Sequence, residues 1–371
     1  MTNKKLIYLT YQTFPANTAN SSQTISNISH LADEGIEVHL YFPLRNSRST
    51  DDLNKLKKFY NTNSDFKVFG LDHNYPHGKL NFLKPFWFHL SHFFWSKKII
   101  KNYFKEISKN VFFTRSEWIA YFLASQGSNV VFEIHQTSKI RDLVVQKLKK
   151  MENIKFICLN ENLQKNYNIN NNCIVLHNGV DVSYKNTKSE LLTKPYSIIF
   201  VGNISRFNES RGLEDIITWF DDPVLKNNYI LEIVGGDSKP VENLKILVKN
   251  LNLQDSVLIN GWVDKTSVVQ KMQKSNIGLL MNNNKNLHSY FYTSPLKYFE
   301  YLNSNLSIVA VDFPSHKVLP FSDYINFFKY GDKYSFVEAL SKSKNKILLS
   351  DEDLYTISLS NRAKKIINFI F

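Results

Sequence analysis

The sequence predicts an α/β protein of two domains, each built on its own parallel sheet. Short apolar segments alternate with helical patterns in both halves of the chain, which is the order that βαβ units produce. The 371 residues exceed what one ordinary hydrophobic core organises. The polar, charged segment Tyr184–Pro195 separates the two alternating regions, and we expect it to be the linker.

The amino-terminal half begins with a βαβ unit. Lys5–Leu9 is an apolar strand, Thr24–Glu34 is a helix, and Ile36–Phe42 is a second strand. The polar loop Tyr11–Ser22 joins the first strand to the helix. We expect this loop to lie at the carboxyl ends of the strands, where open α/β sheets bind ligands.

The alternation continues to the end of this half. Segment 43–78 is polar and irregular apart from a helix near Asp52–Tyr60, and the strand at 130–134 ends at His135. The further strands expected are Asn110–Phe113, Val130–Ile134, Lys155–Leu159 and Cys173–Leu176, and the helices between them are Glu117–Ala124, Ile140–Lys150 and Asn162–Tyr167.

The carboxyl-terminal half repeats the pattern. Strands begin at Tyr196, Tyr229, Val257, Ile277 and Leu306, with helices at Leu213–Phe220, Val241–Asn250 and Ser267–Lys274 between them. Two helices, Tyr334–Lys344 and Asp353–Phe369, close the chain.

Residues 288–312 contain a candidate anion site. Ser294 and Pro295 are typical of a helix start, because serine caps backbone N–H groups and proline suits the first helical position. A helix N-terminus attracts anions, and Lys297 adds a full charge beside it. Glu300 lies one turn deeper and suits sugar hydroxyls, so the layout fits a pyrophosphate joined to a ribose. The alternative is a surface helix with an i,i+3 Lys–Glu pair.

The chain is strongly basic. Its net charge is +13, from 46 Lys and Arg against 33 Asp and Glu, and this favours a polyanionic neighbour. Segment 79–105 interleaves aromatic residues with lysines, which is typical of helices at an anionic membrane surface. The alternative is that these rings fill the core. No RNA-binding signature accompanies them, so nucleic acid is not an expected partner.

Other site classes have little support in the sequence. Cys158 and Cys173 are too few for a disulfide scaffold or a cysteine-built metal site. We expect no clustered carboxylates of the Asp-x-Asp kind to be poised for Mg²⁺, so no metal is predicted. The N-terminus has no signal peptide and no apolar run is long enough to span a bilayer. We therefore expect a cytoplasmic protein, with peripheral membrane contact through 79–105.

The segment Ser-Pro-Leu-Lys-Tyr-Phe-Glu-Tyr-Leu, followed by a Ser-Ile-Val-Ala strand, resembles the nucleotide-sugar site of family-four retaining glycosyltransferases. These enzymes have the GT-B fold, two Rossmann-like domains facing a cleft. The resemblance implies a first domain at 1–185, a second at 196–350, and a last helix at 351–371 that crosses back to the first domain.

The resemblance also implies how the donor is bound. The loop and helix start, Ser294, Pro295 and Leu296, would hold the donor diphosphate, and Glu300 would hold the nucleotide ribose. The family's E-x7-E pattern has Tyr292 in place of its first glutamate.

Other residues match the family's motifs one by one. Gly202 ends a strand of the Val-Gly type, and Arg206 and Arg211 match the two cations that clamp the donor phosphates with Lys297. The turn with Trp262 and Val263 would hold the base, His135 would face the donor sugar, and Asn178 marks the end of the first domain. The loop at Ala16, Asn17 and Thr18, where relatives carry glycines, would contact the acceptor.

Each of these residues also has an ordinary structural reading. The arginines would be surface residues, His135 a strand-end side chain bonded to backbone, and Trp262 part of the core.

The implied function is retaining, metal-independent transfer of a hexose from a nucleotide-diphospho-sugar, with a UDP-sugar favoured and no further cofactor. The acceptor would be a lipid, a lipid-linked sugar or a polysaccharide at the inner membrane face. Two alternatives remain open at this point: a GT-B nucleotide-sugar epimerase, and a non-catalytic protein that binds nucleotide-sugars or polyanions.

Overall fold

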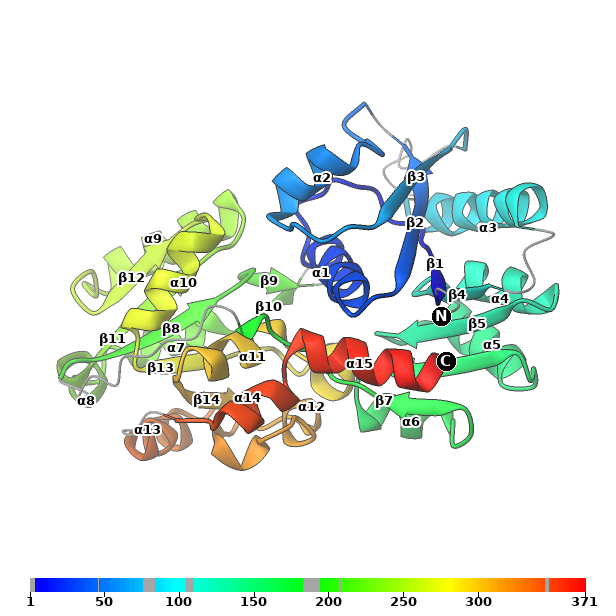
Figure 1. Ribbon diagram of the computed structural model, residues 1–371. Helices are drawn as coiled ribbons and strands as arrows, with labels where there is room; N and C mark the ends of the chain where they lie inside the picture. The colour runs from blue at the N-terminus through cyan, green and yellow to red at the C-terminus, as the bar shows by residue number, and fades with distance from the viewer. Residues whose placement is uncertain are drawn as a thin grey trace. The chain divides into compact units, whose positions relative to one another are not determined.

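The computed structural model describes residues 4–45, 47–75, 84–104, 110–182, 194–206, 209–343 and 347–371. The chain divides into two compact units (Figure 1). The first unit comprises Met1–Leu176 together with Leu359–Phe371, and the second comprises His177–Ser358.

The first unit is built on a parallel sheet. Its strands are β1 (Lys5–Leu9), β2 (Glu37–Leu44), β3 (Lys67–Asp72), β4 (Val111–Thr114), β5 (Asn129–Ile134), β6 (Ile154–Cys158) and β7 (Cys173–Val175). They lie in the order β3-β2-β1-β4-β5-β6-β7, and each neighbouring pair is parallel. The strand order reverses between β1 and β4, the kind of position at which open α/β sheets bind ligands.

Helices cover this sheet on both faces. They are α1 (Ala19–Asp33), α2 (Leu53–Tyr60), α3 (Lys84–Tyr103), α4 (Glu117–Ser125), α5 (Lys139–Leu148), α6 (Glu161–Tyr167) and α15 (Leu359–Ile370). Strands β1 and β5 are almost continuous runs of buried side chains, as expected for parallel strands covered on both faces. The last helix, α15, packs against α1 through Ala363, Ile366 and Ile370.

The second unit has its own parallel sheet. Its strands are β8 (Tyr196–Val201), β11 (Tyr229–Val234), β12 (Val257–Asn260), β13 (Ile277–Leu280), β14 (Ser307–Val311) and β15 (Ile325–Phe328). They lie in the order β12-β11-β8-β13-β14-β15, so the order reverses between β8 and β13. A two-stranded hairpin, β9 (Ser205–Arg206) with β10 (Glu209–Ser210), follows β8.

The helical segments of the second unit, with the α-helices first, are α7 (Leu213–Trp219), α8 (Pro223–Asn228), α9 (Ser238–Asn250), α10 (Lys265–Lys274), α11 (Leu296–Asn303), α12 (Pro314–Lys317), α13 (Lys333–Lys342), α14 (Asp351–Thr356), the π-helical η3 (His288–Tyr292) and the 3-10 segment η4 (Ser322–Tyr324).

One helix start and two edge strands differ from the expectation by more than a residue or two. Helix α1 begins at Ala19 and not at Thr24, because Thr18 caps it by accepting a hydrogen bond from the Ser21 backbone N–H at 3.2 Å. The segment 43–78 was expected to be irregular, yet it contains edge strand β3, whose side chains are mostly half-exposed and give little apolar signal. Edge strand β15 was missed for the same reason.

The expected closing helix, Asp353–Phe369, is two helices, α14 and α15. The break falls where Ser358 bridges to Val180, and the Val180 backbone N–H donates to the Ile357 carbonyl at 3.0 Å. As a result α14 belongs to the second unit and α15 to the first, so the crossing begins at Leu359 and not at 351. At the other crossing, the first unit ends at Leu176, whereas 185 was expected.

Candidate functional site

The carboxyl edge of the second sheet contains several of the predicted donor-binding residues. Gly202 follows β8 with φ of +145°, a conformation that favours glycine. Gly212 precedes α7 with φ of +82°, and a Cβ there would lie 2.9 Å from the Met281 side chain. Gly212 therefore lets the β8–α7 loop lie close against the end of β13.

Arg206 and Arg211 are both carried by this loop. Arg206 donates from Nη2 to Nε2 of His288 at 3.0 Å, and its Nη1 lies 3.5 Å from the Thr293 hydroxyl. The Arg211 backbone N–H donates to the Ile204 carbonyl at 3.1 Å. Its guanidinium lies over the Phe200 ring, 5.8 Å from the centroid.

The two arginines influence each other electrostatically. Burial, with a further contribution from the Arg206 charge, lowers the pKa of Arg211 to about 10, and burial lowers the pKa of Arg206. Both remain protonated at neutral pH. Within the residues that the structure describes, Arg211 has no carboxylate at ion-pair distance. The arrangement is therefore a concentration of positive charge at the sheet edge.

The start of α11 differs from the prediction. Ser294 does not cap the helix and Pro295 is not its first residue: Pro295 is the N-cap position, without a side-chain cap, and Leu296 begins the helix. The Ser294 hydroxyl instead accepts from the Asn178 backbone N–H at 3.1 Å, and the Asn178 amide donates to the Ser294 carbonyl at 2.5 Å. A partner so distant in the sequence replaces the local cap.

Helix α11 is packed onto the end of β8. The Tyr301 hydroxyl accepts from the Val201 backbone N–H at 3.0 Å, which places α11 beside Gly202. On the first turns of α11, Lys297 and Glu300 form an ion pair, each with about a third of its side chain exposed. This is the i,i+3 contact given as the structural alternative, and both groups remain accessible from solvent.

The predicted base-binding turn lies between β12 and α10. Trp262 is 77% exposed, so the expectation of a core tryptophan is wrong. Val263 is half-buried and packs against the α11 side of the core. The Trp262 indole is not packed in the core, and at the carboxyl edge of the sheet it presents a flat apolar face to solvent.

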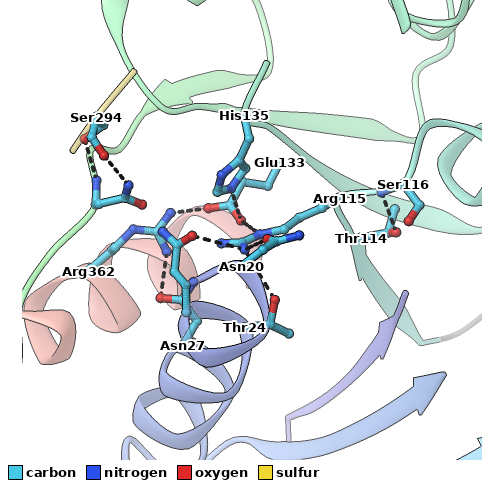
Figure 2. Close-up of polar contacts among 12 residues, drawn as sticks. Asn20, Thr24, Asn27, Thr114, Arg115, Ser116, Glu133, His135, Ser294 and Arg362 are labelled. Carbon is cyan, nitrogen blue, oxygen red and sulfur yellow. Dashed lines mark hydrogen bonds and ion pairs between the residues drawn. The ribbon is translucent and has the colours of Figure 1, made fainter. Parts of the chain in front are cut away.

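In the first unit, His135 follows β5 and contacts a buried carboxylate (Figure 2). Its Nε2 lies 2.9 Å from Oε2 of Glu133, and that oxygen also accepts from Nε of Arg115 at 2.6 Å. Arg362, from α15, contacts the other carboxylate oxygen. The sequence analysis gave a histidine bonded to backbone as the alternative. That alternative is wrong for Nε2, because this nitrogen contacts a side-chain carboxylate.

Electrostatics in this cluster fix the charge states. Burial by itself would raise the pKa of Glu133, but Arg115 and Arg362 outweigh it and hold the pKa well below its ordinary value. Burial, followed by the Arg115 charge, lowers the pKa of His135 to about 4. At neutral pH the glutamate is ionised and the histidine is neutral.

The predicted acceptor loop lies beside α1. The Ala16 backbone N–H donates to the Tyr60 hydroxyl at 2.8 Å, while Asn17 and Thr18 are exposed. The Thr18 hydroxyl caps α1, as described above. Asn17 is the side chain of this loop that has no such structural contact among the described residues.

Helix α3 separates its side chains into two faces. Trp95, Ile99 and Ile100 are buried, whereas Phe86 and Phe94 are 57% and 46% exposed. The lysines at 97, 98 and 101 and the ring of Tyr103 are also exposed. The core alternative is confirmed for the buried face of α3, and membrane contact stays a prediction for the exposed face. Residues 79–83 and 105 lie outside the described residues.

The described residues contain neither a metal cluster nor a membrane-spanning helix. No group of three His, Cys, Asp or Glu side chains is placed to hold a metal ion in the part of the chain that the structure describes. None of the described helices is both long and apolar enough to cross a membrane.

Solved structures resemble the whole chain. The lipopolysaccharide outer core galactosyltransferase WaaB superposes with a TM-score of 0.68 at 16% identity, covering 99% of both chains. A glycosyltransferase from Rickettsia africae gives 0.68 at 14% identity, covering 99% of this chain and 98% of that one. Anabaena HepE, solved with UDP and glucose, gives 0.61 at 12% identity, covering 99% and 95%.

The chain has the GT-B fold. The resemblance to GT-B glycosyltransferases expected from residues 294–302 is thereby confirmed, and so is the fold class of two parallel α/β units with a returning last helix.

The similarity in sequence covers less of the chain than the similarity in fold. No family model matches the chain. A curated relative, alpha-monoglucosyldiacylglycerol synthase from Streptococcus pneumoniae, is 24% identical over 172 residues, which is 45% of this chain. The match spans 37% of that protein's length.

Within the GT-B fold, the sequence reasoning missed several residues that position the site. His288 and Thr293 hold Arg206, and Arg115 and Arg362 hold Glu133. One signal was present: a glutamate inside the apolar strand β5 must be buried, and a buried carboxylate requires cationic partners. The sequence around Glu133 did not indicate which arginines would be those partners.

Proposed function

We propose that this GT-B protein is a metal-independent, retaining glycosyltransferase that moves a hexose from a nucleotide-diphospho-sugar, with UDP favoured. The observation that carries the proposal is the concentration of charge at Arg206 and Arg211 on the carboxyl edge of the second sheet. Arg211 is half-buried, and its Nε is buried without a hydrogen-bond partner among the described residues, which is costly unless a ligand uses the charge.

The chemistry requires such a site. When the bond between the anomeric carbon and the phosphate oxygen breaks, the diphosphate gains negative charge. Fixed cations that meet this charge lower the barrier, as metal ions do in other transferases. Arg206 and Arg211 offer bidentate hydrogen bonds to phosphate oxygens, and Lys297 adds a third charge on α11. The acceptor hydroxyl forms the new bond with retention, and its proton passes to the departing phosphate.

The remaining donor contacts follow from the same edge of the sheet. Glu300 would accept hydrogen bonds from the ribose hydroxyls and exchange its contact with Lys297 for the ligand. Trp262 would stack on the base, together with the backbone at Val263. Gly202 and the segment from Ser294 to Leu296 would approach the diphosphate with their backbone groups.

The names of similar proteins support the substrate class. One is a galactosyltransferase of the lipopolysaccharide outer core, one was solved with UDP and glucose, and one is a synthase of a glucosyl diacylglycerol. We therefore propose a lipid, lipid-linked or polysaccharide acceptor, bound by the first unit near Ala16 to Thr18.

The exposed face of α3 supports a position on an anionic membrane surface. Phe86 and Phe94 provide apolar insertion, and Lys97 and Lys98 provide attraction. We propose that the enzyme works as a peripheral protein at the cytoplasmic face, with α3 as its contact.

A nucleotide panel tests the donor assignment. UDP, GDP, ADP and CMP are compared by thermal shift, and radiolabelled UDP-hexoses are then offered with membrane extracts as acceptor. We expect UDP to raise Tm and label to enter the lipid fraction. Conversion of the UDP-hexose without acceptor would indicate an epimerase. The absence of any nucleotide shift, with strong heparin retention, would indicate a polyanion-binding protein.

Vesicle flotation tests the membrane contact. Each lysine near an anionic surface contributes about 1 kcal/mol, so Lys97→Glu with Lys98→Glu should weaken binding to phosphatidylglycerol vesicles at least tenfold. The matched control is Lys245→Glu with Lys249→Glu on α9, which reverses two exposed lysines of another helix. Equal losses in both variants would show a net-charge effect and contradict a specific α3 contact.

A further inference from the structure

The end of β5 carries two polar residues on one face. Glu133 and His135 are two positions apart in an extended segment, so their side chains project to the same side. Glu133 is completely buried, whereas 20% of the His135 side chain is exposed. The carboxylate therefore lies behind the histidine and the ring lies at the surface of the site.

Both carboxylate oxygens of Glu133 are held by cations. Arg115, immediately after β4, donates from Nε to Oε2 at 2.6 Å, and Arg362 of α15 contacts Oε1. The carboxylate is consequently fixed in position and ionised, and its Oε2 faces Nε2 of His135 at 2.9 Å.

The two arginines are fixed in turn by α1. Arg115 Nη1 lies 3.1 Å from the Asn20 side-chain oxygen and 3.3 Å from the Thr24 hydroxyl, and Arg362 Nη1 lies 3.4 Å from the Asn27 side-chain oxygen. Figure 2 shows these side chains converging on Glu133 from α1, β5 and α15. Four segments of the first unit thus determine one carboxylate position.

We propose that Glu133 is a positioning residue that holds His135 as the neutral tautomer protonated on Nε2, with Arg362 of the last helix completing the arrangement. His135 Nε2 makes no hydrogen bond of good geometry among the described residues, but an ionised carboxylate oxygen at 2.9 Å repels a lone pair, so this nitrogen must carry the proton. Nδ1 is then unprotonated and accepts a hydrogen bond. This inference rests on the proposed function and on the expectation, implied by the family resemblance, that His135 faces the donor sugar.

The consequence for substrate recognition is specific. A neutral histidine with a free Nδ1 lone pair accepts a hydrogen bond from a sugar hydroxyl and does not stabilise a phosphate by charge. His135 then supplies hydroxyl recognition and no phosphate neutralisation. A role for His135 as a cation is excluded by this arrangement at neutral pH.

Nitrogen-15 NMR of the histidine side chains tests the tautomer directly, without substrate. The full chain is labelled at histidine, and the His135 signals are assigned by their loss in His135→Asn. We expect protonated Nε2 and unprotonated Nδ1 at pH 7.5. A ring protonated on Nδ1, or an equal mixture of tautomers, would overturn the proposal whether or not the protein transfers sugar.

Two variants and a control test the positioning role. Glu133→Gln should remove the tautomer preference and lower kcat roughly tenfold to a hundredfold, the usual range for a group that orients a functional histidine. Glu117→Gln is the matched control, because Glu117 is also buried and paired with an arginine, Arg141 at 2.8 Å. It should leave the His135 tautomer unchanged. Full kcat in Glu133→Gln would overturn the positioning role.

Arg362→Met covers the case in which Glu133→Gln does not fold. Loss of this nearby positive charge should raise the titration midpoint of His135, because Arg362 is one of the charges that disfavour its protonation. An unchanged midpoint would overturn the participation of Arg362. If His135 is protonated on Nε2 as expected but the protein transfers no sugar, the result contradicts the proposed function and leaves the tautomer proposal intact.

Discussion

The buried arginines of the first unit and the half-buried arginines of the second unit differ in their counter-charges. In the first unit, Arg115 and Arg362 share the carboxylate of Glu133. In the second unit, Arg211 has no carboxylate partner among the described residues, and its neighbouring charge is another arginine, Arg206. The difference teaches that a buried cation with a fixed counter-charge stabilises the fold, whereas the charge of Arg211 is not neutralised by a carboxylate of the described residues.

The energetic cost of each arrangement explains the difference. A buried ion pair offsets much of the desolvation cost of both partners, and removal of one partner exposes the other to the full cost. An arginine without such a partner carries its cost in the folded protein, visible in the lowered pKa of Arg211. Variants of these arginines should therefore separate stability from activity.

The largest expected effect is on stability in the first unit. Arg115→Met should lower the free energy of unfolding by about 3–5 kcal/mol, because the buried Glu133 loses one of its two cations. Urea unfolding followed by intrinsic fluorescence measures it. Arg211→Met is the control in the second unit and should change stability by less than about 1 kcal/mol, since it leaves no buried charge unpaired. Equal losses would contradict the comparison.

The next effect is on activity in the second unit. Arg211→Ala should lower sugar transfer by about 10²–10³-fold, the usual range for loss of one group that stabilises developing negative charge. Tm should change little. Arg211→Lys keeps the charge but not the bidentate geometry and should recover part of the rate. Near-normal transfer by Arg211→Ala would remove this arginine from the site.

A pH series extends the comparison to histidines. Burial lowers the pKa of His92 to about 3 and of His135 and His316 to about 4. The unfolded chain protonates these histidines more readily than the folded chain does. Their contribution to the free energy of unfolding is therefore complete above about pH 6.5 and is lost as the pH falls toward 4. Each histidine contributes at most about 1.4 kcal/mol per pH unit.

The first unit contains two of these histidines and the second contains one, so the first should lose stability more steeply. Unfolding midpoints at pH 7, 6 and 5 measure this, and His92→Leu should reduce the slope. A midpoint that stays constant between pH 6.5 and 5 would contradict the buried, neutral state of these rings.

The smallest effect is at Trp262. Because this ring is 77% exposed, Trp262→Ala should leave the free energy of unfolding unchanged. A base–aromatic stack is worth about 1–3 kcal/mol, so UDP affinity should fall about tenfold by calorimetry. Leu258→Ala, another exposed apolar residue of this sheet, is the control. Unchanged UDP affinity would place the base elsewhere.

Much of the fold was accessible from the sequence. The central strands of both sheets are short, continuous apolar runs, and their alternation with helices predicted two parallel sheets. The edge strands β3 and β15 were missed because half-exposed strands lack that signal. The start of α1 was missed because its first turn, Ala19 to Ser22, is as polar as a loop.

The candidate site was less accessible, and the reason is distance along the chain. Arg206 and Arg211 were identified because they match the two phosphate-clamping cations of the family's motif, within one loop beside a strand end. The partner of Ser294 is Asn178, and a partner of Glu133 is Arg362. Contacts between such distant residues leave no local pattern, so the predicted Ser294 cap was wrong and the Glu133 cluster was not foreseen.

The return of α15 to the first unit has a consequence for the order of assembly. Translation produces the first sheet, then the whole second unit, and only afterwards the helix with Arg362. Until Leu359–Phe371 leave the ribosome, Glu133 has one arginine and α1 lacks the apolar partner that covers it. The nascent first unit is thus finished last, although it is synthesised first.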